Sequence, residues 1–406
     1  MLARLVAPLS MAGFFEAHWG RASRHFRAPQ RARFDDLTPS DGWRAWVRAS
    51  AVIDAATQDA AGSQKQRRVD AHSFEAAFDG GETICADVSG AEPVAAGLAA
   101  MTARLRPVEG EPFAKLYVSP TGAGFAMHMD AHHVFVVQLS GTKRWWFGDA
   151  PAVPHALLGG KVDPAGRAVH TYPRDGWPIA GPGGRPLLAP DRSALTSVVL
   201  EPGDVLYLPP GTWHTTRATE DSVALSVSPP RVPLSAVLLG ALRERLDTDP
   251  QWRRDVVCTS TGGSVQSVSE ALTWGVQRLP AEAAALTPDA TTLGWARRTF
   301  AGPPPSPREL APLQPQAVVR HVDGGFVWLR APDPEDGTPA IFVFRPGIEL
   351  ALPAEAERFV TRLAAQPRAT VAQIEAYEPS WTVEDTRDLL ASLIEMGVLT
   401  VVTERA

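Results

Sequence analysis

The sequence has few cysteines and no long apolar run. Cys85 and Cys258 are its only cysteines, and their separation fits neither a metal-binding pair nor a disulfide framework. We therefore expect two packed, reduced thiols. No stretch approaches the ~20 apolar residues that a membrane-spanning helix needs, and the apolar start is too short for a secretory signal. These absences predict a soluble cytoplasmic enzyme with no membrane partner.

Basic residues are fewer than acidic ones, with 39 Lys and Arg against 45 Asp and Glu. The net charge is −6, which argues against a nucleic-acid partner, because nucleic-acid-coating surfaces are normally basic. The length of 406 residues exceeds what one compact core usually holds, so two or three domains are expected. The 37 prolines and 33 glycines indicate short elements separated by many turns.

Composition along the chain predicts four parts. Residues 1–230 are expected to form the catalytic domain with a helical N-terminal part, 231–300 a helical segment, 301–315 a proline-rich linker and 316–406 a winged-helix-like domain. In the helical segment, leucines at 238, 239, 242 and 246 form one stripe. That stripe fits a core-facing helix as well as it fits a dimer interface.

Short β-rich runs broken by glycine and proline extend from Lys115 to Ser228 and are typical of a barrel or sandwich. The region before about residue 112 is expected to be mixed and mostly helical, with Ser10 capping a first helix. The segment 151–191 is rich in Gly and Pro and is expected to be a surface excursion near the barrel mouth.

Three residues in this β-rich region predict a metal site. In an extended strand, His128 and Asp130 lie on one face and can bind the same metal ion. Further along, a strand and a Pro-Pro-Gly turn deliver His214 to the start of the next strand. Two imidazoles and a carboxylate leave three coordination positions, which suits ferrous iron with a chelating keto acid and O₂. A cupin site with His-x-His and a nearby Glu is the rival, but that Glu is missing.

Residues 115–230 resemble the JmjC-type, cupin-4 family of ribosomal oxygenases. The family motif matches at His128, Asp130, Val134, Phe135, Gln138, Gly141, Lys143 and Trp145, with the third ligand at His214. The resemblance implies a mixed α+β protein built on a double-stranded β-helix that uses Fe(II), 2-oxoglutarate and O₂. It also implies a helical dimerisation segment, and hence a homodimer, followed by a C-terminal winged helix.

The same resemblance assigns the far carboxylate of 2-oxoglutarate to Lys143. A fixed ammonium would offset the desolvation of a carboxylate carried into the barrel. The residues alone support Lys143 and its neighbour Arg144 almost equally as the residue that binds this carboxylate. The spacing of the family motif favours Lys143. Tyr117 and Ser119 share a strand face, and Ser226 can also point inward, so these three are further candidates for binding the cosubstrate.

The substrate is less constrained by the sequence. His132, His133 and Trp213 are candidates for the substrate pocket, and Ala224 replaces an Asn that relatives can carry near the cofactor. We expect hydroxylation of a protein side chain, Arg or His of a ribosomal protein, with no catalytic residue beyond the metal ligands. The alternatives are a tailoring hydroxylase of a peptide natural product or small molecule, and a non-enzymatic metal cupin that binds a partner.

Overall fold

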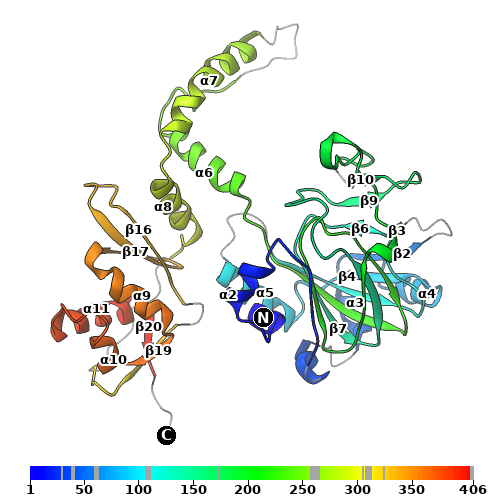
Figure 1. The fold of residues 1–406 in the computed structure, drawn as a ribbon, viewed down its shortest axis with the longest axis horizontal. Coiled ribbons are helices and arrows are strands. Elements are labelled where there is room, and N and C mark those ends of the chain that lie inside the picture. Colours follow the sequence, from blue (N-terminus) through cyan, green and yellow to red (C-terminus); the bar gives the residue numbers. More distant parts are fainter. Residues whose placement is uncertain are drawn as a thin grey trace. The chain divides into compact units, whose positions relative to one another are not determined.

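The computed structural model describes residues 1–28, 31–37, 42–58, 64–105, 111–171, 173–256, 266–303, 306, 313–322 and 325–402. The chain divides into two compact units, Met1–Arg231 and Val232–Ala406 (Figure 1). Cys85 is a buried free thiol, as predicted, whereas Cys258 and much of the expected linker lie outside the described residues. Within the described ranges, no helix has the length and apolar character needed to cross a membrane.

Two antiparallel sheets form the body of the first unit. The larger one contains, in spatial order, β1 (Arg24–Phe26), β12 (Val205–Leu208), β7 (Val134–Ser140), β14 (Ser222–Ser228), β5 (Phe113–Ser119), β4 (Thr83–Asp87), β2 (Ile53–Gln58) and β3 (Gln64–Val69). The smaller one contains β10 (Ala168–His170), β9 (Gly160–Val162), β6 (His128–Met129), β13 (His214–Ala218), β8 (Lys143–Phe147) and β11 (Thr196–Leu200). Inward side chains of both sheets line one cavity.

Helices cover the larger sheet and complete its core. They are α1 (Leu2–Val6), α2 (Met11–Ala17), η1 (Arg31–Leu37), α3 (Trp43–Ala49), α4 (Phe74–Asp79) and α5 (Val94–Leu105). Ser10 caps α2 by accepting the Gly13 N–H at 3.1 Å, as predicted. Phe14 of the same helix is completely buried against Phe135 and Tyr207 of the sheet.

The structure corrects two expectations about this unit. The region before residue 112 is less helical than expected, because it also holds β1 to β4. Of these, β3 is an exposed edge strand with no apolar alternation, so its sequence does not indicate a strand. The segment 151–191 is more than a surface excursion. Its strands β9 and β10 extend the smaller sheet, with β9 pairing directly with β6.

The second unit is mixed α and β. It contains the helices α6 (Leu234–Asp247), α7 (Gln266–Ala284), α8 (Pro288–Thr299), η4 (Ala354–Ala356), α9 (Glu357–Ala365), α10 (Val371–Glu375) and α11 (Val383–Glu395). Its two three-stranded sheets are β16 (Val327–Pro332), β17 (Pro339–Arg345) and β18 (Ile348–Pro353), and β19 (Arg368–Thr370), β15 (Val318–His321) and β20 (Leu399–Val401). Thr382 caps α11 in a capping box with Asp385. The winged-helix assignment stays a prediction.

Candidate metal centre

The three predicted ligands meet at one point between the strands. His128 on β6 pairs in register with His214 on β13, and Asp130 directly follows β6. One ligand atom from each of the three residues lies within 4.8 Å of the others. The Nε2 atom of His214 is 3.5 Å from Oδ2 of Asp130, and the two imidazole centroids are 4.1 Å apart. Strand parity and the turn before His214 therefore place these residues as the sequence predicts.

Backbone carbonyls orient both imidazoles. Nδ1 of His128 donates to the Ala126 carbonyl at 2.8 Å, and Nδ1 of His214 donates to the Thr212 carbonyl at 2.9 Å. A proton held on Nδ1 leaves the Nε2 lone pair free for a metal. This donor set, two neutral nitrogens and a carboxylate with positions left open, fits ferrous iron.

Electrostatics keep His214 and Asp130 in their metal-binding forms. Burial, helped by the neighbouring His128, lowers the pKa of His214 to about 4. Burial alone would raise the pKa of Asp130, but His132, His128, His214 and Lys115 together lower it to about 2. At neutral pH, His214 is therefore neutral and Asp130 is ionised, which are the states that bind a metal.

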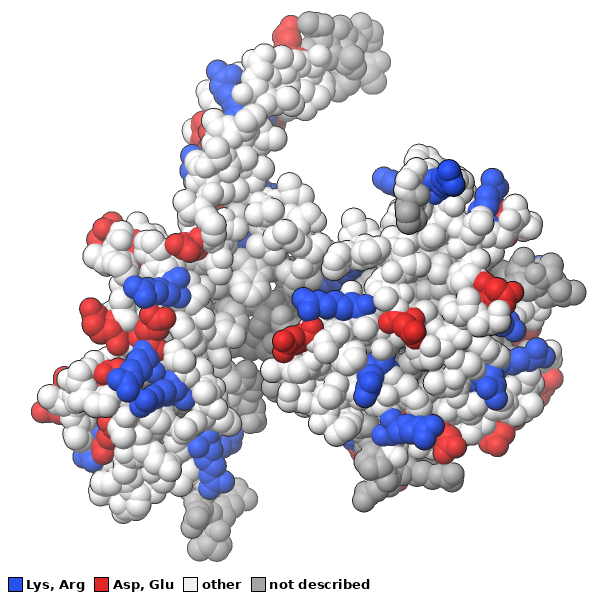
Figure 2. All heavy atoms as spheres, in the orientation of Figure 1, with Lys and Arg blue, Asp and Glu red and all other residues white. Residues whose placement is uncertain are grey.

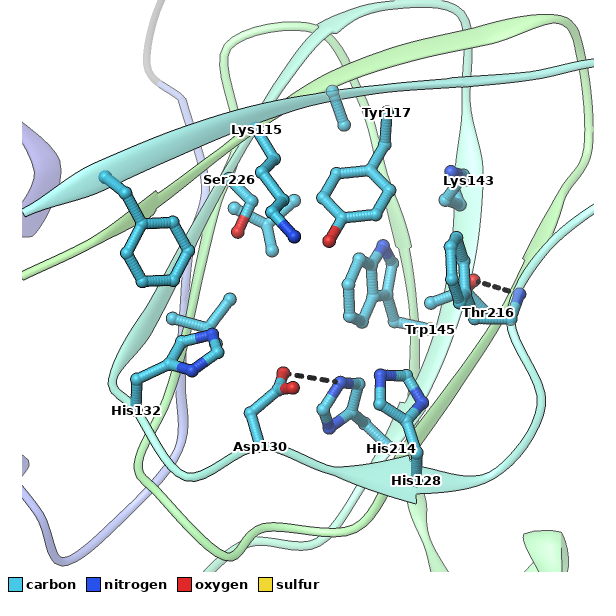
Figure 3. Close-up of a pocket in the computed structure, with 15 residues that line it drawn as sticks. Lys115, Tyr117, His128, Asp130, His132, Lys143, Trp145, His214, Thr216 and Ser226 are labelled. Atoms are coloured by element: carbon cyan, nitrogen blue, oxygen red, sulfur yellow. Dashed lines mark hydrogen bonds and ion pairs between the residues drawn. The ribbon is translucent and has the colours of Figure 1, made fainter. Parts of the chain in front are cut away.

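The ligands open onto a cavity of about 120 Å³ (Figure 3). Its lining residues come from both sheets and from the turns beside them: Phe113, Lys115, Tyr117, Phe125, His128, Asp130, His132, Val134, Val136, Lys143, Trp145, His214, Thr216, Ala224 and Ser226. Trp145 lies close to parallel with the His214 ring, with centroids 5.8 Å apart. The apolar members screen the metal site from water.

Lys143 is a fully buried cation at one end of this cavity. Its Nζ donates to Oγ of Ser119 at 2.7 Å, and Ser119 also accepts a hydrogen bond from Thr83 at 2.9 Å. Burial lowers the pKa of Lys143 to about 7. Arg144 faces away from the cavity and contacts Ser197 at 3.4 Å. Of the two basic neighbours, Lys143 is the one that the fold points at the metal site.

The other cosubstrate candidates are also near the cavity. Tyr117 and Ser226 line it, whereas Ser119 is buried behind the lining and reaches it through Lys143. Sequence reasoning missed Lys115, which lies opposite Ser226 in the pairing of β5 with β14. The signal was present, because Lys115 is two residues before Tyr117 on the same strand face.

Two of the three predicted substrate-pocket residues, His133 and Trp213, do not line the cavity. His132 lines the cavity with its ring edge-on to Phe113, but His133 points into the core. The His133 ring stacks on Trp19 at 3.8 Å, and its Nδ1 is 2.8 Å from the Tyr207 hydroxyl. Burial lowers the pKa of His133 to about 3, so its imidazole is neutral.

Trp213 does not line the cavity either. It is only 3% exposed and packs in an apolar cluster with Met129, Ala168 and Ile179. Ala168 and Ile179 belong to the segment 151–191, which covers this side of the smaller sheet. No local pattern in the sequence indicates that packing, so the prediction that Trp213 lines the pocket entrance is wrong.

Comparison with known proteins identifies the domain that carries this site. Residues 100–163 and 186–236 match the model of the JmjC domain family, and the matched segments contain all three ligands and Lys143. Over these residues the chain is similar to the JmjC domain. The JmjC resemblance seen in the motifs is therefore confirmed.

Individual relatives match parts of the chain. YxbC of Bacillus subtilis (strain 168) is 27% identical over 179 residues, which cover 43% of this chain and 51% of that protein. The ribosomal protein uL16 3-hydroxylase of Escherichia coli (strain K12) is 30% identical over 113 residues, 27% of this chain and 23% of that enzyme. The chain thus aligns with about half of one curated relative and about a quarter of the other.

Solved structures give a longer but weaker match. The structure of YcfD, a ribosomal oxygenase from Escherichia coli, in complex with cobalt and 2-oxoglutarate aligns with 98% of this chain and 99% of that chain. The TM-score is 0.46 at 17% sequence identity. The complex of YcfD with cobalt and succinic acid aligns equally widely, with a TM-score of 0.45 at 19% identity.

Proposed function

We propose that the JmjC domain is an Fe(II)- and 2-oxoglutarate-dependent oxygenase that hydroxylates a side chain. The observation that carries this proposal is the convergence of His128, Asp130 and His214 on a cavity that also holds the buried ammonium of Lys143. Two histidines and one carboxylate with open positions are the ligand set of non-haem iron oxygenases. A cation deep in the same cavity suits a dicarboxylate cosubstrate.

The bound iron would supply the oxidising chemistry, in which one atom of O₂ enters a C–H bond and the other enters succinate as CO₂ leaves. The residues of this chain bind and orient the reactants. Lys143 holds the far carboxylate, and Ser119 fixes the lysine by its 2.7 Å hydrogen bond. Tyr117 offers a hydroxyl to the cosubstrate, and Trp145 helps to keep water away from the metal. No side-chain base is required.

For the substrate we propose a side chain of a ribosomal protein. The sequence similarity to the uL16 3-hydroxylase of E. coli supports this choice. Of the two side chains expected from the sequence, Arg would bring a second cation against Lys115, whereas neutral His would not. His is therefore the first side chain to test, and a small-molecule or peptide tailoring reaction is the alternative.

Nucleic acid is a poor candidate for the partner. On the visible face of each unit, basic and acidic side chains are interspersed (Figure 2). Helix α11 begins with Glu384 and Asp385 in its first turn, where contact with phosphate would need positive charge.

The function is tested by incubating the protein with Fe(II), 2-oxoglutarate, O₂ and a purified mixture of ribosomal proteins. Mass spectrometry should find one added oxygen atom on a single side chain, and the His214→Ala variant should produce none. A parallel incubation with short peptides and amino acids tests the tailoring alternative. Product formation by His214→Ala at the wild-type rate would overturn the assigned metal site.

We also propose that α6 forms a dimer contact. Leu238 and Leu239 are 45% and 64% exposed, so the reading of these two as core-facing residues does not hold within the described chain. Burying such leucines between two copies would stabilise a dimer. Light scattering should find a dimer for the wild type and a monomer for Leu239→Glu. Leu157→Glu, at a leucine of the other unit that is 69% exposed, is the matched control.

A further inference from the structure

The metal cavity contains a second lysine with no assigned task. Lys115 lies on β5, and its ammonium points into the cavity beside the hydroxyls of Ser226 and Tyr117 (Figure 3). Within the part of the chain that the structure describes, no hydrogen bond or ion pair engages this ammonium. Lys143, by contrast, already donates to Ser119. A cation directed into a partly enclosed cavity is costly unless an anion joins it.

Neither the metal nor its cosubstrate supplies that anion. With iron and 2-oxoglutarate bound, the divalent cation and Lys143 offset the charges of Asp130 and of the two cosubstrate carboxylates. The charges of the site are then balanced, and the charge of Lys115 remains. A negative charge on the remaining reactant, the substrate, would pair with it.

The surroundings of Lys115 suit a carboxylate. Ser226 is its direct cross-strand partner in the register of β14 with β5 and offers a hydroxyl donor on the same face. His132 also faces the cavity, with its ring held edge-on to Phe113 at 5.0 Å between centroids. A lysine, a hydroxyl and an imidazole provide donors for the two oxygens of a carboxylate.

We propose that Lys115, Ser226 and His132 form a carboxylate-binding subsite for the substrate, next to the carbon that is hydroxylated. The carboxylate belongs to a residue next to the hydroxylated one in a peptide, or to a free acid of similar shape. This inference rests on the proposed oxygenase function. It makes Lys115 a specificity-determining residue and gives it no part in holding 2-oxoglutarate.

The test compares isosteric acid and amide probes on protein loaded with Co(II) and 2-oxoglutarate without O₂. One pair is N-acetyl-aspartate methylamide and its asparagine analogue, and the other is a 15-residue peptide with a central Asp or Asn. Calorimetry and the cobalt absorption spectrum report binding. Wild-type protein should prefer the acid at least about tenfold, as expected for a hydrogen bond between charged groups. Preference in the peptide pair alone identifies a protein substrate, and preference in both pairs a carboxylate as such.

Three variants separate the possible explanations. Lys115→Met should lose the preference for the acid and keep the wild-type affinity for 2-oxoglutarate, which also shows that it is folded. Lys115→Arg should retain the preference because it keeps the charge. Lys161→Met removes a lysine that pairs with Asp175 outside the cavity and should behave as wild type.

The contrary results are distinct. Failure of wild-type protein to bind 2-oxoglutarate overturns the proposed function itself. If 2-oxoglutarate binds but acid and amide probes bind equally, or neither binds, the carboxylate subsite is wrong. If Lys115→Met weakens the binding of 2-oxoglutarate as much as Lys143→Met does, Lys115 belongs to the cosubstrate site instead.

Discussion

A lysine lies at each end of the metal cavity, and the two lysines differ in burial and in hydrogen bonding. Lys143 is buried, held by Ser119, and has a pKa lowered to about 7 by its burial. Lys115 is only half-buried and has no hydrogen-bond partner among the described residues. The first arrangement is fixed before any ligand arrives, as suits a cosubstrate that is the same in every turnover. The arrangement at Lys115 gains its hydrogen-bond partner only when the substrate binds.

Removing a metal ligand should have the largest effect on the cavity. Outer-shell partners of a metal site typically contribute about 10- to 100-fold in affinity, so loss of a ligand should exceed that range. We expect His214→Ala to bind Fe(II) more than 100-fold more weakly, as measured by metal titration. The control is His132→Ala, which removes a cavity histidine that is not a ligand. A comparable loss in both variants would mean that the triad is misassigned.

Removing the cation at the Lys143 end should be nearly as damaging. Lys143→Met should weaken 2-oxoglutarate binding by about 10- to 150-fold, the range for a hydrogen bond to a charged group. Arg144→Met is the matched control, because Arg144 is adjacent in sequence but faces away from the cavity. Equilibrium binding without O₂ measures both. A larger loss for Arg144→Met would reverse the choice between the two residues.

The lowered pKa of Lys143 predicts a pH dependence of cosubstrate binding. The protonated ammonium binds the carboxylate, and its pKa in the empty cavity is about 7. Affinity should therefore be nearly constant below pH 7 and fall by up to about tenfold per unit above it. Lys143→Arg should flatten the profile, because a guanidinium stays charged. A wild-type affinity that is constant well above pH 7 would contradict the assignment of Lys143.

Loosening the support of Lys143 should have the smallest effect. Ser119→Ala removes the 2.7 Å hydrogen bond to Nζ but keeps the charge. The affinity for 2-oxoglutarate should fall only about 2- to 10-fold, the range for a typical intramolecular hydrogen bond, because the ammonium remains and can still bind the carboxylate. Ser228→Ala removes another buried serine of the same sheet and should leave the affinity unchanged. Equal losses in the two variants would indicate a general disturbance of the sheet.

The sequence predicted the part of the site that depends on local geometry. Strand parity places His128 and Asp130 on one face, and the Pro-Pro-Gly turn sets the position of His214, so these three could be read from the residues. It could not separate His132 from His133, because both precede β7 in an irregular stretch. Trp19, from a distant part of the chain, is what draws His133 into the core.

The same limit explains the missed strands and the missed lysine. The polar edge strand β3 carries no apolar alternation, so only its pairing with β2 reveals it. Lys115 shares a face with Tyr117, which indicates that the two side chains point the same way, but the sequence does not show how far this face is enclosed as a cavity. That depends on the second sheet, which closes the other side with His128 and His214.

The most direct test of the central claim is the absorption spectrum of the protein with Fe(II) and 2-oxoglutarate in the absence of O₂. The wild type should show a metal-to-keto-acid absorption band. This band should disappear in His214→Ala and should need a higher concentration of 2-oxoglutarate in Lys143→Met. A wild-type protein that binds Fe(II) and shows no such band at saturating 2-oxoglutarate would contradict that claim.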